Sequence, residues 1–207
     1  IKIVLANNND EHYEYILTWL NQLFSNPTEI TRRCLVFHSS EHQAGKGIFW
    51  NFVRESVLGC KHVSKRSGTA FLTNTFNAEL RGNVLNICEE VPDMHESPNA
   101  KKLMDQFKEL ITEPYITIHE KNKTPVNEAN YNNWVLLSND THPIQIQQGD
   151  KRIVKFECSN QFAGDHEYFK KLASILTRAQ SDVTKKLANE FYTYIYSKRK
   201  RQLPFRC

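Results

Sequence analysis

Hydrophobic positions in the first third of the chain alternate between helical spacing and one continuous run. Apolar residues recur three and four positions apart over 13–24, which predicts an amphipathic helix. An unbroken apolar run over 34–37 predicts a buried strand, and helical spacing returns over 48–57. The pattern therefore starts as helix, strand and helix.

The same alternation continues to the C-terminal end. A hairpin tip over 121–124 is indicated by the composition Lys-Asn-Lys-Thr, and 64–68 is a polar stretch with no apolar pattern. The remaining predicted elements are a short helix around 75–80, a strand over 84–88, a helix that Ser97-Pro98 opens, strands over 115–119, 134–137 and 153–156, and helices over 169–176 and 183–195.

This order of elements predicts an α/β fold, with a central, mostly parallel sheet that helices flank on both faces. A length of 207 residues fits one such domain. We expect residues 1–30 to form an N-terminal helix leading into the core, 31–160 to form the core, and 161–207 to form a C-terminal helical segment. The first residue is Ile, so the sequence is expected to be part of a longer protein.

Composition narrows the class of protein only slightly. A net charge of +4 is compatible with nucleic-acid binding but is far below the charge density of a protein that coats DNA. The five cysteines include no C-x-x-C pair, which favours reduced core thiols in an intracellular protein over disulfides or a zinc site. No apolar stretch is long enough to predict a signal peptide or a membrane span.

The clearest chemical signal is the polar loop between the strand over 34–37 and the helix after it. Such a loop can wrap a polyphosphate, because flexible backbone lets successive N–H groups point inward and a lysine meets the phosphate oxygens. It departs from G-x-x-x-x-G-K-[ST] by having Ser40 for the first Gly and Gly47 for the magnesium-binding hydroxyl. The alternative is an ordinary strand-turn-helix with a solvated lysine. The candidate phosphate-binding residues are Ser40, Gln43, Ala44, Gly45, Lys46 and Gly47.

Polar residues at other strand ends would complete a hydrolytic site. Nucleotide hydrolysis needs a carboxylate for Mg²⁺, a second carboxylate to orient water, a polar group at the γ-phosphate and an arginine. Glu89 and Glu90 end one predicted strand, Asn139 follows another, and Arg152 precedes the last. Each also has a plainer interpretation, as a solvated loop carboxylate, a strand-ending turn or a solvated charge.

The whole pattern resembles the superfamily 3 helicase domain, a branch of the AAA+ P-loop ATPases found in viral, phage and mobile-element primase-helicases. The segments that carry the resemblance are NDEHYEYILTWLNQLF, AGKG, TAFLTNTFNAELRGNVLNICEEV, MDQFKELITEPYITIHEKNKTPVNEANYNNWVLLSN and GDKRIVKF. The resemblance implies an AAA+-like P-loop core that binds ATP and Mg²⁺ between the subunits of a homo-oligomeric ring, usually a hexamer. Single-stranded DNA would thread this ring, with translocation 3′ to 5′.

Carried over by position, the resemblance makes Lys46 the phosphate-binding lysine, Glu89 the metal carboxylate and Glu90 the residue that orients water. Asn139 becomes the γ-phosphate sensor. Arg152 becomes the arginine that acts on a neighbouring subunit, with Lys151 as the fallback.

Basic residues on and near the predicted hairpin are candidates for nucleic-acid contact. Lys121 and Lys123 would touch DNA phosphates from the hairpin between Ile118 and Pro125, and Lys108 is a further candidate on the helix before it. The alternative for all three is a solvated surface charge. The basic run 198–201 is open between nucleic-acid contact, an import signal and a solvated tail.

Two function classes stay open at this point. The first is an ATP-dependent helicase motor for replication of a virus or mobile element, acting in the host cytoplasm or nucleus, with an upstream primase domain as a further expected partner. The second is a catalytically weak or inactive ring or scaffold that binds DNA, with or without nucleotide, because Gly47 removes a metal ligand. A small-molecule kinase is a weaker third interpretation, since no acceptor site is visible.

Overall fold

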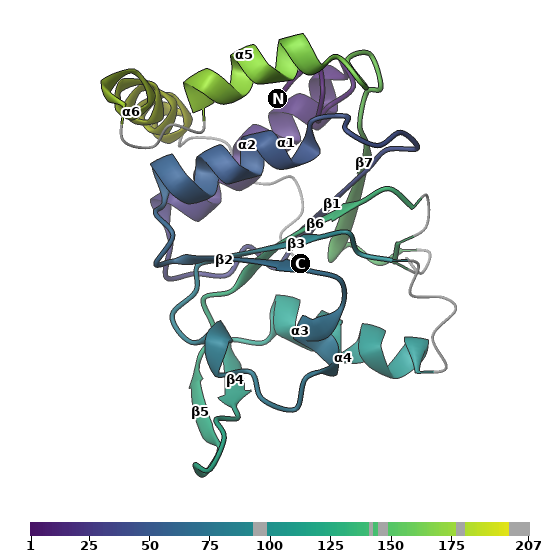
Figure 1. The fold of residues 1–207 in the computed structure, drawn as a ribbon. Coiled ribbons are helices and arrows are strands. Elements are labelled where there is room, and N and C mark those ends of the chain that lie inside the picture. Colours follow the sequence, from purple (N-terminus) through teal and green to yellow (C-terminus); the bar gives the residue numbers. More distant parts are fainter. Residues whose placement is uncertain (93–98, 141–142, 145–148, 177–180, 199–207) are drawn as a thin grey trace.

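The computed structural model describes residues 1–92, 99–140, 143–144, 149–176 and 181–198. Its centre is a five-stranded parallel sheet in the order β2-β3-β6-β1-β7 (Figure 1). Strand β1 carries the predicted apolar run, and all five of its residues are buried between the two layers of helices. The strands are β1 (Cys34–His38), β2 (Val63–Ser67), β3 (Leu85–Glu89), β6 (Asn133–Ser138) and β7 (Ile153–Glu157).

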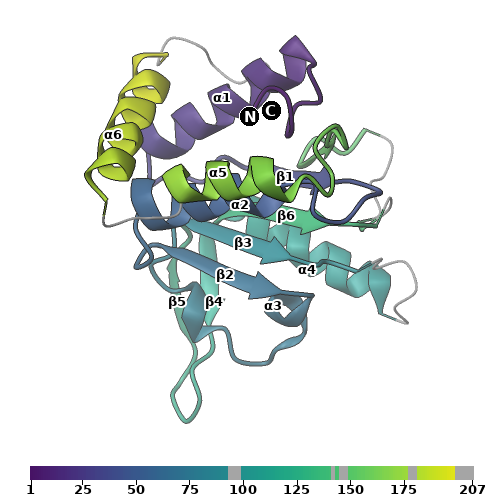
Figure 2. The same cartoon turned by 45° about the horizontal axis from the view of Figure 1, so that its top comes forward.

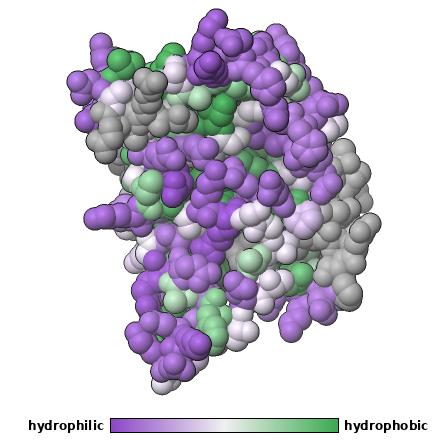
Figure 3. Space-filling view, in the orientation of Figure 1, coloured by the Kyte–Doolittle hydropathy of each residue, from purple (hydrophilic) through white to green (hydrophobic). Residues whose placement is uncertain are grey.

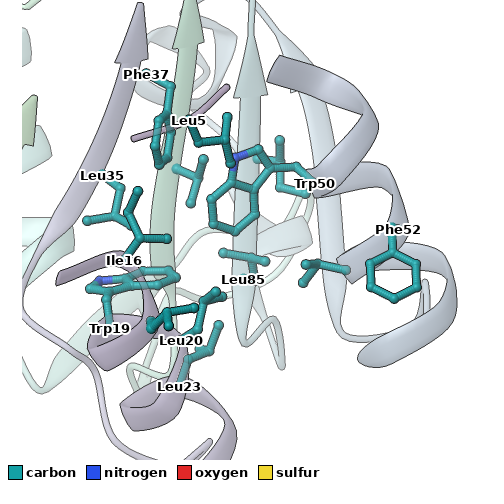
Figure 4. Packing of buried hydrophobic residues seen from close by; sticks show 14 of the residues in the cluster. Leu5, Ile16, Trp19, Leu20, Leu23, Leu35, Phe37, Trp50, Phe52 and Leu85 are labelled. Atoms are coloured by element: carbon teal, nitrogen blue, oxygen red, sulfur yellow. The ribbon is translucent and has the colours of Figure 1, made fainter. Parts of the chain in front are cut away.

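One face of the sheet is covered by four helices (Figures 1 and 2). A large apolar core lies beneath them, where Trp19 from the first helix meets Trp50 from the second at 6.2 Å between ring centroids (Figure 4). Phe37 on β1 packs against Trp50 at 5.6 Å, which fixes the second helix over the strand that feeds it. The helices are α1 (Asp10–Ser25), α2 (Lys46–Phe52) with its π-helical continuation Val53–Val57, α5 (His166–Leu176) and α6 (Asp182–Ser197).

The other face carries smaller elements and a second core (Figure 1). Helix α4 (Ala100–Thr112) packs there, with the short helix α3 (Ala70–Thr73) and the 3₁₀ helix Ala78–Leu80. The antiparallel hairpin of β4 (Tyr115–Ile118) and β5 (Val126–Ala129) projects from this face (Figure 2). Ile116 and Ile118 on β4 are buried in the core while Tyr115 is exposed, so period-two alternation anchors the base of the hairpin.

The predicted fold class is confirmed: the protein has an α/β fold with a parallel sheet, flanking helices and C-terminal helices. One strand is not predicted, and one local prediction is wrong. Residues 64–67 of the polar stretch form most of β2, an edge strand of which only Val63 is buried, so it has no apolar run to detect. The single helix predicted around 75–80 is replaced by α3 and the 3₁₀ helix. The helix start predicted at Ser97-Pro98 lies outside the described residues, and the three-segment division stays a prediction.

The surface and the cysteines fit the compositional expectations. Figure 3 shows a mostly hydrophilic face on which hydrophobic side chains form small separate groups. Within the described part of the chain, no helix combines the length and the apolar character needed to cross a membrane. Cys34, Cys88 and Cys158 are buried free thiols, whereas Cys60 is exposed. Burial raises the pKa of Cys88 and of Cys158 to about 12, which keeps both protonated.

Candidate functional site

Glu89, Glu90 and Asn139, predicted at strand ends, meet Lys46 in one pocket. Strand β6 lies between β1 and β3, so the carboxyl ends of these three parallel strands are neighbours at one edge of the sheet. The pocket there has a volume of about 430 Å³. It is lined by residues 43–48, Asn51, Glu89, Glu90, residues 137–139, His166 and Phe169.

The loop after β1 bends sharply just before helix α2. Gly45 has a φ of +85°, in the left-handed region that glycine adopts without strain, and Lys46 is the first residue of the helix. Gln43 also has a positive φ, of +57°. The turn therefore directs the Lys46 side chain from the helix start into the pocket.

Lys46 is a buried cation with neutral partners. Its side chain is almost wholly buried, and its Nζ donates to the Ser39 hydroxyl and to Oδ1 of Asn139 at 2.9 Å. No carboxylate among the described residues forms an ion pair with it. Burial lowers the pKa of Lys46 below its ordinary value, because desolvation disfavours the charged form. A buried ammonium without a counter-charge is suited to binding an anion.

The side-chain amide of Asn139 connects the end of β6 to the loop after β1. Its Oδ1 accepts from Lys46, and its Nδ2 lies 3.1 Å from Nδ1 of His42 on the loop. The preceding residue, Ser138, donates to the Val91 carbonyl at 2.6 Å, which fixes the end of β6 against the chain leaving β3. The amide is thus held beside the Lys46 ammonium.

The two glutamates at the end of β3 point to different partners. Glu89 Oε2 forms an ion pair with Lys65 Nζ at 2.8 Å, and Glu89 Oε1 lies 3.0 Å from the point where a Cβ at position 47 would stand. Glu90 has a φ of +53° and accepts a hydrogen bond from the Ser67 hydroxyl at 2.8 Å. Both carboxylates border the pocket that contains Lys46.

These residues fit a nucleotide with Mg²⁺. Mg²⁺ is usually held by one or two carboxylates together with waters and the phosphates of its substrate. Among the described residues, no group of three or more His, Cys, Asp or Glu side chains could hold a metal ion by itself. Glu89 would hold the metal together with phosphate oxygens that Lys46 attracts, with Glu90 beside it at the same pocket. The Glu89 carboxylate lies next to Gly47, in the space where a hydroxyl-bearing side chain at position 47 would stand.

Arg152 and Lys151 are not brought into this pocket. Arg152 lies just before β7, at the amino ends of the parallel strands, whereas the pocket lies at their carboxyl ends. Its Nε and Nη2 each bond the Asp150 carboxylate at 2.9 Å. Arg152 therefore does not reach the pocket of its own chain.

The lysines proposed to touch nucleic acid are in two different environments. Lys121 and Lys123 are at the hairpin tip, where Lys123 is 64% exposed and pairs with Glu120 at 2.7 Å. The Lys108 side chain is only 9% exposed, and its Nζ lies 3.7 Å from Asp105 and 3.8 Å from Asp150. Lys108 is therefore a buried side chain that pairs with the buried Asp150, and it does not share the exposed surface of the hairpin.

The basic run at the end of the chain is only partly described. Lys198 Nζ lies 3.5 Å from Glu14 and 4.9 Å from the centre of the Tyr194 ring. These contacts hold Lys198 against the helical layer. The other residues of the run, 199–201, lie outside the described residues.

Sequence reasoning missed several residues that line or support the pocket. Lys65 comes from the undetected strand β2, and Asn51 is a polar position of α2. His166 and Phe169 come from α5, and the Phe169 ring lies against Gly45. The only advance signal was the helical pattern that placed Phe169 on an apolar face, and that pattern does not tell which partner the face covers.

Comparisons with known proteins match this chain to one family model, to one phage protein and to solved structures. A model described as a family of unknown function, DUF5906, matches residues 37–152. A DNA primase-polymerase of Nitratiruptor phage NrS-1 is 29% identical over 119 residues, which are 56% of this chain and 16% of that protein. The apo structure of the NrS-1 C-terminal region aligns with a TM-score of 0.73 and 20% identity. A second apo structure, in the A form, aligns with a TM-score of 0.67 and 20% identity.

The structural alignments span almost the whole chain. They cover 96% of it in both cases, and 50% and 44% of the two solved chains. This protein therefore has the fold of part of the NrS-1 C-terminal region, and it spans about half of the first solved region it matches.

Proposed function

This chain belongs to the DUF5906 family, and from that premise we propose that it is the ATP-hydrolysing motor of a phage or mobile-element replication protein. In this proposal it acts as a superfamily 3 helicase on single-stranded DNA, moving 3′ to 5′ as a homo-oligomeric ring. The similarity to a phage DNA primase-polymerase supports a role in replication and an upstream primase domain.

One observation carries the proposal: the Lys46 ammonium is buried and without a carboxylate partner, in a pocket that also contains Asn139, Glu89 and Glu90. An exposed lysine would need no anion, and a buried structural lysine is ordinarily ion-paired. The triphosphate of a nucleotide supplies the missing negative charge, and acidic groups stand where Mg²⁺ would bind.

Each of these side chains has a role in the proposed reaction. Lys46 binds phosphate oxygens, and Asn139, at 2.9 Å from its Nζ, reaches the same phosphate. Glu89 holds the metal, and Glu90 orients the attacking water. Bound Mg²⁺ supplies electrostatic stabilisation of charge on the phosphates. Arg152 completes a neighbouring subunit's site, because it lies across the sheet from its own pocket.

The test measures phosphate release with and without a single-stranded DNA oligonucleotide. We expect DNA to stimulate release by the wild type. Lys46→Ala is expected to abolish nucleotide binding, and Glu90→Gln to preserve binding while reducing turnover by about 100-fold or more. The matched control is Glu167→Gln, an exposed glutamate on α5. Release that ignores DNA and survives both pocket changes would contradict the proposal.

A second candidate function is a ring or scaffold that binds DNA and nucleotide with little or no turnover. Gly47 favours it by removing a hydroxyl ligand, and the Phe169 ring against Gly45 restricts the loop that would wrap the phosphates. Nucleotide binding that depends on Lys46, without phosphate release in the presence of DNA, would support this candidate over the motor.

A further inference from the structure

We propose that Lys65 sets the Mg²⁺ requirement of the nucleotide site, by holding Glu89 in an ion pair that the metal has to displace. This inference rests on the proposed function, because it assumes that the pocket binds a nucleotide together with Mg²⁺. It assigns a role to a residue of the edge strand that no sequence motif marks.

Lys65 connects three elements at the rim of the pocket. It extends from β2, and its Nζ lies 2.8 Å from Glu89 Oε2 and 2.9 Å from Oδ1 of Asn51 on α2. The side chains of Lys65 and Glu89 are 28% and 29% exposed, so both are partly shielded from water. The ammonium therefore has two fixed oxygen partners and holds the carboxylate toward the start of α2.

Gly47 makes this position of the carboxylate possible. Glu89 Oε1 lies 3.0 Å from the site that a Cβ at position 47 would occupy, a spacing tighter than ordinary van der Waals contact. A serine or threonine there would crowd the glutamate as it stands. The carboxylate thus fills the space that a hydroxyl ligand would take, with one oxygen at Gly47 and the other on Lys65.

Mg²⁺ and Lys65 compete for this carboxylate. The Lys65 ammonium, 2.8 Å from Glu89, neutralises the carboxylate. A Mg²⁺ ion bound to the same carboxylate would be repelled by this positive charge. A partly exposed ion pair is worth up to about 1 kcal/mol, which is about five-fold in a binding constant. We therefore expect removal of the Lys65 charge to lower the Mg²⁺ concentration needed for nucleotide binding by about five-fold.

The experiment titrates Mg²⁺ into the full chain at a fixed concentration of fluorescent ADP and follows nucleotide binding, so it needs no turnover. Lys65→Met is expected to lower the Mg²⁺ midpoint by about five-fold. Lys65→Arg keeps the charge and should retain the wild-type midpoint. The matched control is Lys61→Met, an exposed lysine in the turn before β2.

A further variant keeps the result interpretable. Lys65→Gln replaces the methionine variant if that variant fails to fold, and carries the same expectation.

An unchanged or higher midpoint in Lys65→Met or Lys65→Gln, with nucleotide still bound, would overturn the role of Lys65 and leave the proposed function standing. If the wild type binds no nucleotide at any Mg²⁺ concentration, both proposals fail together.

Discussion

The Phe169 ring lies directly against Gly45, so close that a Cβ atom added at position 45 would stand 2.2 Å from Cε1 of the ring. Helix α5 thereby covers the loop that leads to Lys46. Position 45 is restricted twice, since its φ of +85° disfavours any side chain and the ring leaves no space for one.

These two restrictions can be separated by a double-mutant cycle. We expect Gly45→Ala to lower the free energy of unfolding by about 2–4 kcal/mol, of which about 1–3 is steric overpacking and about 1 is backbone strain. In a Phe169→Ala background, the same change should cost only about 1 kcal/mol, because the backbone strain alone remains. Urea denaturation of the four proteins measures both costs. Equal costs in the two backgrounds would show that the ring does not restrict position 45.

Lys46 is expected to reduce the stability of the nucleotide-free protein. Lys46→Met replaces a buried cation without a counter-charge by an apolar side chain of similar length. It should raise the melting temperature by about 2–4 °C, the shift that about 1 kcal/mol gives in a domain of this size, while abolishing nucleotide binding. Thermal unfolding followed by circular dichroism checks the first effect. A lower melting temperature in the variant would contradict it.

The lowered pKa of Lys46 also makes the stability difference between Lys46→Met and the wild type depend on pH. The folded-state pKa is lowered by burial, so between that value and the ordinary value of 10.5 the unfolded state binds more protons than the folded state. The wild type therefore gains stability as pH rises through this window. The stability advantage of Lys46→Met should shrink from neutral to alkaline pH, and a constant advantage would contradict the assignment.

The apolar pattern of the sequence was sufficient to predict the buried strands and the residues at their ends. Strand β1 is a predominantly apolar run, and Glu89 and Asn139 lie at the carboxyl ends of two other largely apolar segments, so their place at the same end of a parallel sheet was predictable. Edge strand β2 was not predicted because only Val63 is buried in it, so the place of Lys65 at the pocket was not predicted either.

Other parts of the site depend on tertiary contacts that no local pattern reports. Phe169 was predicted on an apolar helical face, but its contact with Gly45 joins distant segments. Lys108 is different, because it lies one helical turn after Met104 and one before Ile111, both buried, and so belongs to the inner face of α4. That spacing was readable in advance, whereas its pairing with Asp150 was not.

Arg81 is expected to hold the hairpin in position. Its guanidinium pairs with Glu120 at 3.1 Å and with Glu128 at 2.8 Å, so it joins both sides of the hairpin to the 3₁₀ helix. Arg81→Ala should speed amide hydrogen exchange over residues 115–129 and weaken single-stranded DNA binding by about five-fold, since two carboxylates near Lys121 and Lys123 lose their counter-charge.

The matched control for Arg81→Ala is Lys101→Ala, an exposed cation on α4 away from the hairpin. Hydrogen exchange measured by mass spectrometry and DNA affinity measured by fluorescence anisotropy report the two effects separately. Unchanged exchange over the hairpin in Arg81→Ala would contradict the positioning role.

Asp150, in the segment just before β7, is expected to stabilise the fold. Its carboxylate is 4% exposed, accepts three hydrogen bonds from Arg152, one from the backbone N–H and two from the guanidinium, and lies near Lys108. Burial by itself raises the pKa of Asp150, but the hydrogen bonds from Arg152 outweigh it, so the pKa lies below the ordinary value of 3.8. The stability that the ionised Asp150 contributes is fully present above pH 3.8, and it is lost as the pH falls through the lower pKa of Asp150 in the folded protein.

Asp150→Asn is expected to lower the free energy of unfolding at neutral pH by about 1–3 kcal/mol, because the buried Lys108 ammonium loses its ion pair with the Asp150 carboxylate. Urea denaturation at neutral pH and below pH 3.8 measures the difference, which should shrink in acid. Asp105→Asn is the matched control, since Asp105 is 58% exposed, and it should cost clearly less.

Complementation between two inactive variants tests whether Arg152 acts in a neighbouring subunit. Arg152 lies at the opposite edge of the sheet from its own pocket, so a site built with it must combine one subunit's Lys46 with the next subunit's arginine. Lys46→Ala and Arg152→Ala are each expected to be inactive as pure rings. Co-expressed in equal amounts, they should regain up to about a quarter of the wild-type ATPase activity, the fraction of mixed interfaces with both groups intact.

Lys151→Ala is the control for that experiment, because it removes the adjacent cation and is expected to stay active alone. If Lys151→Ala is inactive and complements Lys46→Ala while Arg152→Ala does not, the trans-acting cation is Lys151. Recovery with neither variant at any mixing ratio would contradict a site shared between subunits, and would favour a pocket that works, or binds, within a single chain.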